Sequence, residues 1–194
     1  MAHLRRLFCI SFLLLLSSSL FAQQTAALPN AEATALSAAL AGRWTGVLEY
    51  RDYKEPVDST KRVALPTWLL ITAAGQTEAW HYIYDDGPGK VVDEDEMVAF
   101  DMVHETCTIN QKDKAPRTYQ VTGFGTLKAG HGTLVLNGTG TDNHKPSDMR
   151  LTLTVGRNLF SLLEEVRLSG TQDAFAYRHL YRFVRADVPV ATAK

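Results

Sequence analysis

From about residue 42 onward the sequence is a series of short runs in which apolar and polar residues alternate, and this pattern most limits the possible folds. Clusters of glycine, aspartate, asparagine and proline separate the runs, such as DDGPG at 85–89. Alternation with a period of two is typical of strands with one buried face, and the clusters are typical of turns. About nine or ten runs follow one another with no helical pattern between them. We therefore predict an all-β, antiparallel chain.

One helical segment precedes the strands. Asn30 is a favourable N-cap, alanines and leucines fill the following positions, and Gly42 stands where a helix ends. These signals predict a helix over residues 31–41. The run LFSLLEEVRL at 159–168 also has helical propensity, but strand-like runs flank it, and we interpret it as a strand.

The first strand opens with Gly42-Arg43-Trp44, directly after the helix. A short helix followed by Gly-x-Trp resembles the lipocalin and calycin families. The resemblance implies an antiparallel up-and-down barrel of about 8–10 strands with a short N-terminal helix at one end. It also implies that the tryptophan packs at the closed end, beneath an arginine or lysine from the far end of the chain.

The last run, FAYRHLYRFVR at 175–185, supplies that partner if it pairs antiparallel with the first strand. Alternate residues from Phe175 to Arg185 then share one face, and Arg185 lies beside Trp44, where a cation–π contact is favourable. We expect Gly42, Trp44 and Arg185 to close the barrel. The same register sets Tyr50 opposite His179.

Aromatic side chains on the inward faces suggest a ligand cavity toward the open end. Such a cavity suits a small apolar or amphipathic molecule. An equally open alternative is that these side chains fill the core. For His179 an axial heme ligand, a general base and a core histidine bonded to Tyr50 are all open, and the last is favoured. The expected ligand-binding residues are Tyr50, Trp80, Tyr82, Tyr177, His179 and Tyr181.

Composition excludes several classes of function. A formal net charge of -1 with interspersed signs gives no basic surface for nucleic acid. No catalytic, metal-binding or cofactor motif is recognised, so we predict no catalytic residue, no metal and no cofactor. We interpret the acidic run DEDE at 93–96 as a solvated loop, and Cys107 as a small buried apolar residue.

The N-terminus has the layout of a secretory signal peptide. Arg5 and Arg6 precede an apolar stretch at 7–16, and small residues lead to Ala22. We predict cleavage after Ala22, which removes residues 1–22 and leaves no transmembrane segment in the mature chain. A flexible leader at 23–29, one barrel domain at 30–187 and a loose tail at 188–194 would follow.

These features together predict a secreted or periplasmic, lipocalin-like protein that binds a small ligand in its barrel. Two alternatives stay open. One is an enzyme of isomerase or cyclase type on the same barrel, with His179, Tyr50 and Tyr177 as acid–base groups. The other is a structural envelope protein with a filled barrel.

Overall fold

The computed structural model describes residues 27–74 and 77–186. The expected signal peptide, most of the expected leader and the expected tail lie outside these residues. Within them, no helix is long and apolar enough to cross a membrane.

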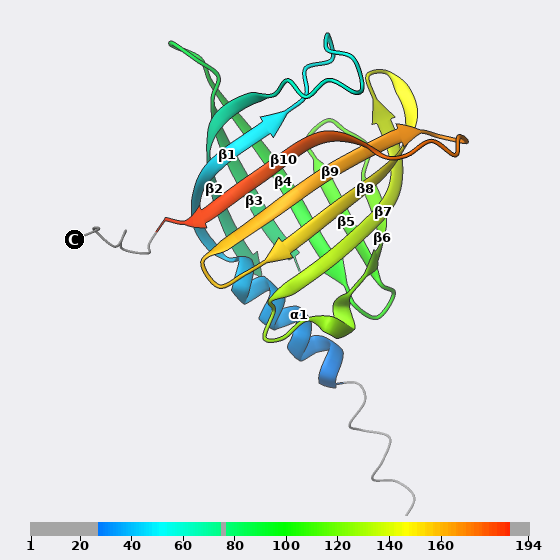
Figure 1. The fold of residues 1–194 in the computed structure, drawn as a ribbon. Coiled ribbons are helices and arrows are strands. Elements are labelled where there is room, and N and C mark those ends of the chain that lie inside the picture. The colour runs from blue at the N-terminus through cyan, green and yellow to red at the C-terminus, as the bar shows by residue number, and fades with distance from the viewer. Residues whose placement is uncertain (1–26, 75–76, 187–194) are drawn as a thin grey trace, which may run out of the picture.

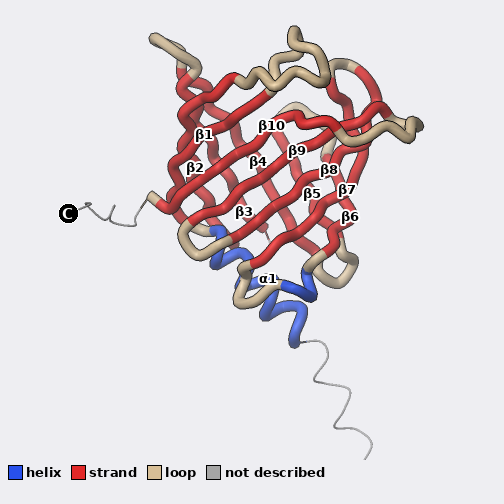
Figure 2. Tube along the Cα trace, viewed as in Figure 1, coloured by secondary structure: helices blue, strands red, loops and turns tan. Residues whose placement is uncertain are grey.

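Ten antiparallel strands form one closed barrel, which confirms the predicted fold class (Figures 1 and 2). Each strand pairs with its neighbours in sequence, and β1 pairs with β10 to close the sheet. The run at 159–168 is strand β9, as expected. The strands are β1 (Gly42–Tyr50), β2 (Val63–Ala74), β3 (Thr77–Asp85), β4 (Val91–Asp101), β5 (Thr106–Gln111), β6 (Arg117–Thr122), β7 (Gly132–Asp142), β8 (Lys145–Val155), β9 (Leu159–Leu168) and β10 (Ala176–Arg185).

Helix α1 (Ala27–Leu40) lies across one end of the barrel, which we call the closed end (Figure 1). It begins four residues before the expected start, so Asn30 lies inside the helix instead of capping it. Leu36 and Leu40 are fully buried in the core, where they anchor the helix to the barrel. A 3-10 turn, η1 (Phe124–Thr126), connects β6 to β7 at this same end.

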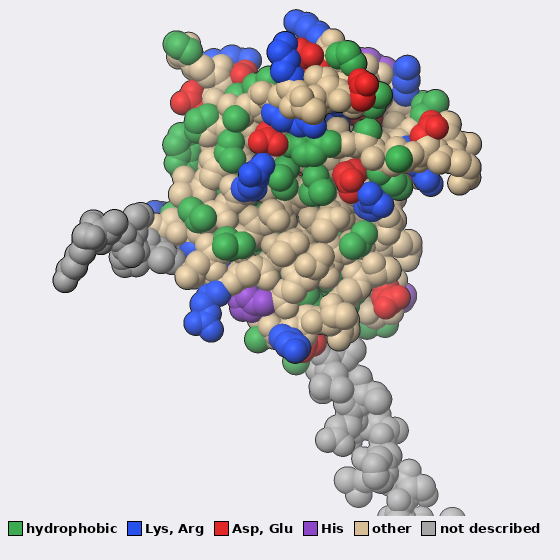
Figure 3. Space-filling view, in the orientation of Figure 1, with side chains coloured by type: hydrophobic (Ala, Val, Ile, Leu, Met, Phe, Trp, Pro, Cys, Tyr) green, Lys and Arg blue, Asp and Glu red, His purple; other side chains and the backbone are tan. Residues whose placement is uncertain are grey.

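The opposite end, which we call the mouth, carries the connections that follow β1, β3, β5, β7 and β9. On the face shown in Figure 3, most charged side chains gather toward this end. The interior is largely apolar near α1 and carries more charged side chains toward the mouth.

The acidic run at 93–96 is part of strand β4, so its interpretation as a loop is wrong. Glu94 and Glu96 share the inward phase with Val98 and Phe100, both of which are buried. Asp95 points outward and lies 2.7 Å from His81 Nδ1 on β3. Acidic residues are unfavourable in strands in general, but here the apolar half of β4 fixes the register for the whole strand.

Candidate functional site

The closed end is sealed by Arg185 and Trp44, which lie opposite each other in the β1–β10 ladder. The Arg185 guanidinium carbon is 4.1 Å from the centroid of the Trp44 ring. Its Nη atoms donate hydrogen bonds to the carbonyl oxygens of Ala39 and Ala41 at the end of α1. Gly42 has φ +126° at this point, and an added Cβ would lie 2.8 Å from Arg185 Nη1. The glycine therefore lets the arginine reach the helix end.

Above this closure, aromatic rings pack against one another along β1, β3, β9 and β10. Tyr82 and Tyr181 lie 5.3 Å apart between ring centroids, and Tyr181 stacks on Phe183 at 5.7 Å. Trp80 and Tyr82 are both buried. We call this set the aromatic wall: Trp44, Trp80, Tyr82, Tyr84, Phe160, Tyr181 and Phe183. The sequence suggested that inward aromatic side chains line a cavity. In the structure these rings pack against one another and fill much of the space instead.

A void of about 20 Å³ lies beside the aromatic wall. Trp80, Glu96 and Cys107 are among the residues that line it. This volume holds about one water molecule. A ligand larger than that would have to displace side chains of the wall.

Tyr177 does not face the interior. The β9–β10 register shifts between Tyr177 and His179, which is a β-bulge, so the single alternation expected for the last strand fails there. The Tyr177 hydroxyl donates to the backbone oxygen of Glu49, an outward-facing residue of β1, at 2.8 Å. The Arg62 guanidinium covers the Tyr177 ring at 4.2 Å. The bulge turns Arg178 inward beside His179.

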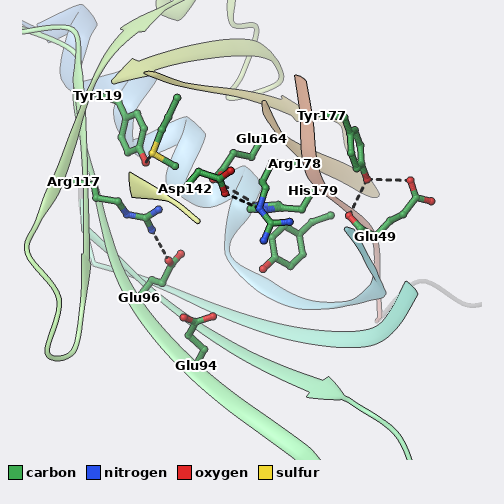
Figure 4. Close-up of polar contacts among 12 residues, drawn as sticks. Glu49, Glu94, Glu96, Arg117, Tyr119, Asp142, Glu164, Tyr177, Arg178 and His179 are labelled. Atoms are coloured by element: carbon green, nitrogen blue, oxygen red, sulfur yellow. Dashed lines mark hydrogen bonds and ion pairs between the residues drawn. The ribbon is translucent and has the colours of Figure 1, made fainter. Parts of the chain in front are cut away.

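Charged groups meet inside the barrel between the aromatic wall and the mouth (Figure 4). They come from strands that are distant in sequence, and most retain some exposure toward the mouth. We call this set the polar interior cluster: Glu94 and Glu96 on β4, Arg117 on β6, Glu164 on β9 and His179 on β10.

Glu96 and Arg117 form an ion pair, with Arg117 Nη2 3.1 Å from Glu96 Oε1. Burial raises the pKa of Glu96 to about 7, against the opposing effect of Arg117. Glu94, nearer the mouth, accepts a hydrogen bond from Gln111 Nε2 at 2.7 Å and lies 3.4 Å from the Lys114 ammonium. The Tyr84 hydroxyl also donates to Glu94, at 3.3 Å, and lies 2.9 Å from the Tyr181 hydroxyl. A chain of hydroxyl groups thus links the aromatic wall to the carboxylates.

Glu164 and His179 face each other at 3.8 Å between Oε2 and Nε2, which is longer than a hydrogen bond. Glu164 accepts no hydrogen bond from any residue in the described part of the chain. Burial raises the pKa of Glu164 to about 7, while Arg117 and Arg178 oppose the shift. Burial, with Arg178 and Arg117 nearby, lowers the pKa of His179 to about 4. Near neutral pH the histidine is therefore uncharged, and Glu164 titrates.

Tyr50 lies opposite His179 in the β1–β10 ladder, as the sequence predicted. The expected hydrogen bond between the two side chains is absent among the described residues, and His179 instead makes an edge contact with the Tyr181 ring at 5.3 Å. His179 therefore belongs to the polar interior cluster.

Four members of the polar interior cluster were not predicted from the sequence: Glu94, Glu96, Arg117 and Glu164. A signal for each was present, because each shares the strand phase of apolar residues that proved to be buried, such as Val98 on β4 and Leu162 on β9. The run at 93–96, which contains Glu94 and Glu96, was interpreted as a solvated loop, and Glu164 was given no role, because buried carboxylates are rare.

The arrangement offers two buried carboxyl groups that titrate near neutrality beside tyrosine hydroxyls. Such groups can exchange protons or bind polar groups of a ligand. The described residues contain no group of three or more histidine, cysteine or acidic side chains that could hold a metal ion. Cys107 is free and buried, and burial raises the pKa of its thiol well above the usual range.

The fold is similar to that of a solved structure, the S-type phycobiliprotein lyase CPES from Guillardia theta. The match has a TM-score of 0.50 and 10% sequence identity, and it covers 78% of this chain and 91% of that one. No protein-family model matches the sequence, and no curated protein matches it. At this identity the likeness concerns the fold alone: the chain is a closed ten-stranded antiparallel barrel, and its fold is similar to that of the lyase.

Proposed function

We propose that this chain is a secreted or periplasmic, lipocalin-like protein that binds a small amphipathic molecule inside its barrel. The observation that carries the proposal is the division of the interior, with an aromatic wall below and the polar interior cluster above. An amphipathic ligand would place its apolar part against the rings and its polar part among Glu96, Arg117 and Glu164. The barrel shared with a phycobiliprotein lyase gives weaker support, from the fold alone.

Native mass spectrometry on protein purified gently from its own producing cells tests this proposal. We expect an adduct of defined mass that is lost on denaturation. Tyr181→Ala should weaken the adduct because it opens the aromatic wall. Trp68→Ala is the matched control, because Trp68 lies on the outer face of β2 and is 47% exposed. A protein without any adduct that also fails to take up apolar fluorescent probes would contradict the proposal and favour a filled barrel, to which the 20 Å³ void also points.

The same preparation tests the proposed localisation. Cleavage of the signal peptide after Ala22 would give a mature protein that begins at Gln23. We expect that mass in the periplasmic or extracellular fraction. An intact N-terminus in the cytosolic fraction would contradict export.

An enzyme is the second candidate, favoured by Glu164 and Glu96, whose pKa values burial raises to about 7. Carboxyl groups that titrate near neutrality suit general acid–base catalysis. Chromatography of the released ligand separates the two functions. A binding protein returns the molecule that was supplied, whereas an isomerase or cyclase returns a compound with a different retention time and the same mass.

A further inference from the structure

A pocket of about 220 Å³ lies at the mouth of the barrel, and none of its lining residues belongs to the polar interior cluster. Arg51 and Tyr53, from the connection between β1 and β2, form one wall. The other walls are formed by Lys145 and Ser147 on β8 and by the last three residues of β9, 166–168. The pocket has room for a small organic group, and it is distinct from the void beside the aromatic wall.

Arg51 is the unusual member of this pocket because it is only 7% exposed. Its Nε donates to the backbone oxygen of Tyr177 at 3.3 Å, and its Nη atoms form no hydrogen bond in the described part of the chain. No carboxylate among those residues forms an ion pair with it either. The Nη atoms are not among the fully buried, unbonded side-chain atoms, so they keep access to the pocket that Arg51 lines. A ligand oxygen in the pocket could therefore accept hydrogen bonds from this largely buried cation.

The position of Arg51 is fixed by its backbone. Its amide donates to the Arg178 oxygen at 3.1 Å, and Arg178 Nη1 donates to the Arg51 oxygen at 2.5 Å. Because Arg51 Nε also donates to the Tyr177 oxygen, the bulged region of β10 contacts both the backbone and the side chain of Arg51. Such pre-organisation lowers the entropic cost of binding.

The charges around the pocket favour an anion. Asp142 is its one carboxylate, and this group already pairs with Arg178 at 2.9 Å and accepts from the Tyr53 hydroxyl at 2.8 Å. Arg167 pairs with Asp148 on β8. Lys145 forms no ion pair among the described residues. Two cationic groups, Arg51 and Lys145, are thus left without a counter-charge.

Apolar side chains complete the lining: Val57, Val166, Leu168 and Ala176.

We propose that this pocket at the mouth binds a small organic oxyanion, which is a carboxylate or a phosphate monoester with a short apolar group, through Arg51 and Lys145. This site goes beyond the proposed function, because it requires no ligand inside the barrel. The apolar group would lie against Val166 and Leu168, while the oxyanion would meet the two cations.

Isothermal titration calorimetry on the purified protein at low ionic strength tests the site with four probes: butyrate, butyl phosphate, butylammonium and inorganic phosphate. We expect saturable binding of at least one organic anion, at least about tenfold tighter than inorganic phosphate. Butylammonium should not saturate. Added salt should weaken the binding, because the contacts are ionic.

Arg51→Gln should weaken binding about tenfold or more, as expected for a buried charged contact. Because Arg51 is buried, its variant is first checked for folding by circular dichroism. Lys145→Gln changes an exposed residue and should weaken binding about three- to fivefold. Lys54→Gln is the matched control, because Lys54 lies in the same connection as Arg51 and does not line the pocket.

Four results would overturn the proposal. They are saturation by neither organic anion, butylammonium binding as tight as that of the anions, unchanged affinity in both the Arg51 and Lys145 variants, and inorganic phosphate binding as tight as either organic anion. The last result would assign the pocket to a free inorganic ion instead of an organic acid.

Discussion

Glu78 near the closed end and Glu164 toward the mouth are both buried carboxylates on inward strand positions, and they differ in their partners. Glu78 accepts hydrogen bonds from Ser37 Oγ on α1 at 2.8 Å and from Trp80 Nε1 at 2.7 Å. Glu164 accepts none in the described part of the chain and has His179 Nε2 at 3.8 Å. Burial raises the pKa of each to about 7.

The comparison shows that a raised pKa by itself does not identify a functional carboxylate. Both oxygens of Glu78 accept hydrogen bonds, and the bond from Ser37 connects α1 to β3, which gives this residue a structural role. The oxygens of Glu164 accept no hydrogen bond from the described residues, so among these residues no bond offsets the cost of burying this group. The carboxylate near the closed end therefore connects two elements of the fold, whereas Glu164 in the polar interior cluster accepts no hydrogen bond from the described residues.

The largest expected effect is at the closed end, on Phe160. Its ring lies 4.8 Å from the Trp44 ring and 4.9 Å from the Phe183 ring, measured between centroids. Phe160→Ala should lower the free energy of unfolding by about 3–5 kcal/mol, because it leaves a cavity in a packed cluster. Urea denaturation measures the change.

Leu159→Ala serves as the control, because Leu159 is 55% exposed, and we expect a loss below about 1 kcal/mol. An equally small loss for Phe160→Ala would mean that the closed end is not the stabilising half of the interior.

The next effect is the pH dependence contributed by Glu164. Because its pKa is about 7 in the folded protein and near 4.5 when exposed, the folded state holds the proton more strongly. Stability should therefore fall as the pH rises from about 4.5 to about 7, by about 3 kcal/mol for this group. The charged and titratable groups that face it are Arg117 on β6, Arg178 and His179 on β10, Asp142 on β7 and Glu96 on β4.

Glu164→Gln removes this titration. The variant should match the wild type at pH 5 and exceed its stability at pH 8. His179 has the opposite sign, because its lowered pKa of about 4 makes stability rise between about pH 4 and 6.5. The difference between variant and wild type isolates Glu164, since both proteins keep His179. An equal loss of stability at both pH values would show that Glu164 is a structural group like Glu78.

A pair of matched substitutions addresses the two carboxylates directly. Glu78→Leu leaves Ser37 Oγ and Trp80 Nε1 without their acceptor and should cost about 2–3 kcal/mol at pH 5. Glu164→Leu removes a carboxyl that accepts no hydrogen bond and should be neutral or stabilising. Thermal unfolding of the two variants under identical conditions gives the comparison. The distinction between the two carboxylates would be wrong if both variants lost the same stability.

The sequence predicted regular parts of the barrel well and its irregular parts poorly. The register from Trp44–Arg185 to Tyr50–His179 follows from counting alternate residues, and it holds because that ladder is continuous. The same counting placed Tyr177 inside, since a β-bulge has no sequence signal in this run. Pro66 pairs with β1 and lies just before the first pair of the β2–β3 ladder, so it is unpaired on one side, as is typical of a proline in a strand.

The candidate site was harder to predict than the fold. The aromatic residues were found from their phase, because apolar side chains at alternate positions indicate an inner face. Glu94 and Glu96 were assigned to a solvated loop, because an acidic run is expected to face solvent when only its composition is considered. In the structure both lie on β4. The tertiary contact with Arg117 on β6 gives the buried Glu96 a counter-charge, and the two residues are 21 apart in sequence.

The smallest expected effect concerns the guanidinium that seals the closed end. Arg185→Met keeps most of the apolar contact with Trp44 but removes the cation–π contact and the hydrogen bonds to Ala39 and Ala41. We expect a loss of about 1–2 kcal/mol in the free energy of unfolding, measured by urea denaturation. Arg182→Met is the control on the same strand, because Arg182 has a 57% exposed side chain that pairs with Glu49, and it should change stability by less than about 0.5 kcal/mol. If both variants lost the same small amount, Arg185 would be one more surface charge, and the closure would rest on Trp44 and the glycine at position 42 alone.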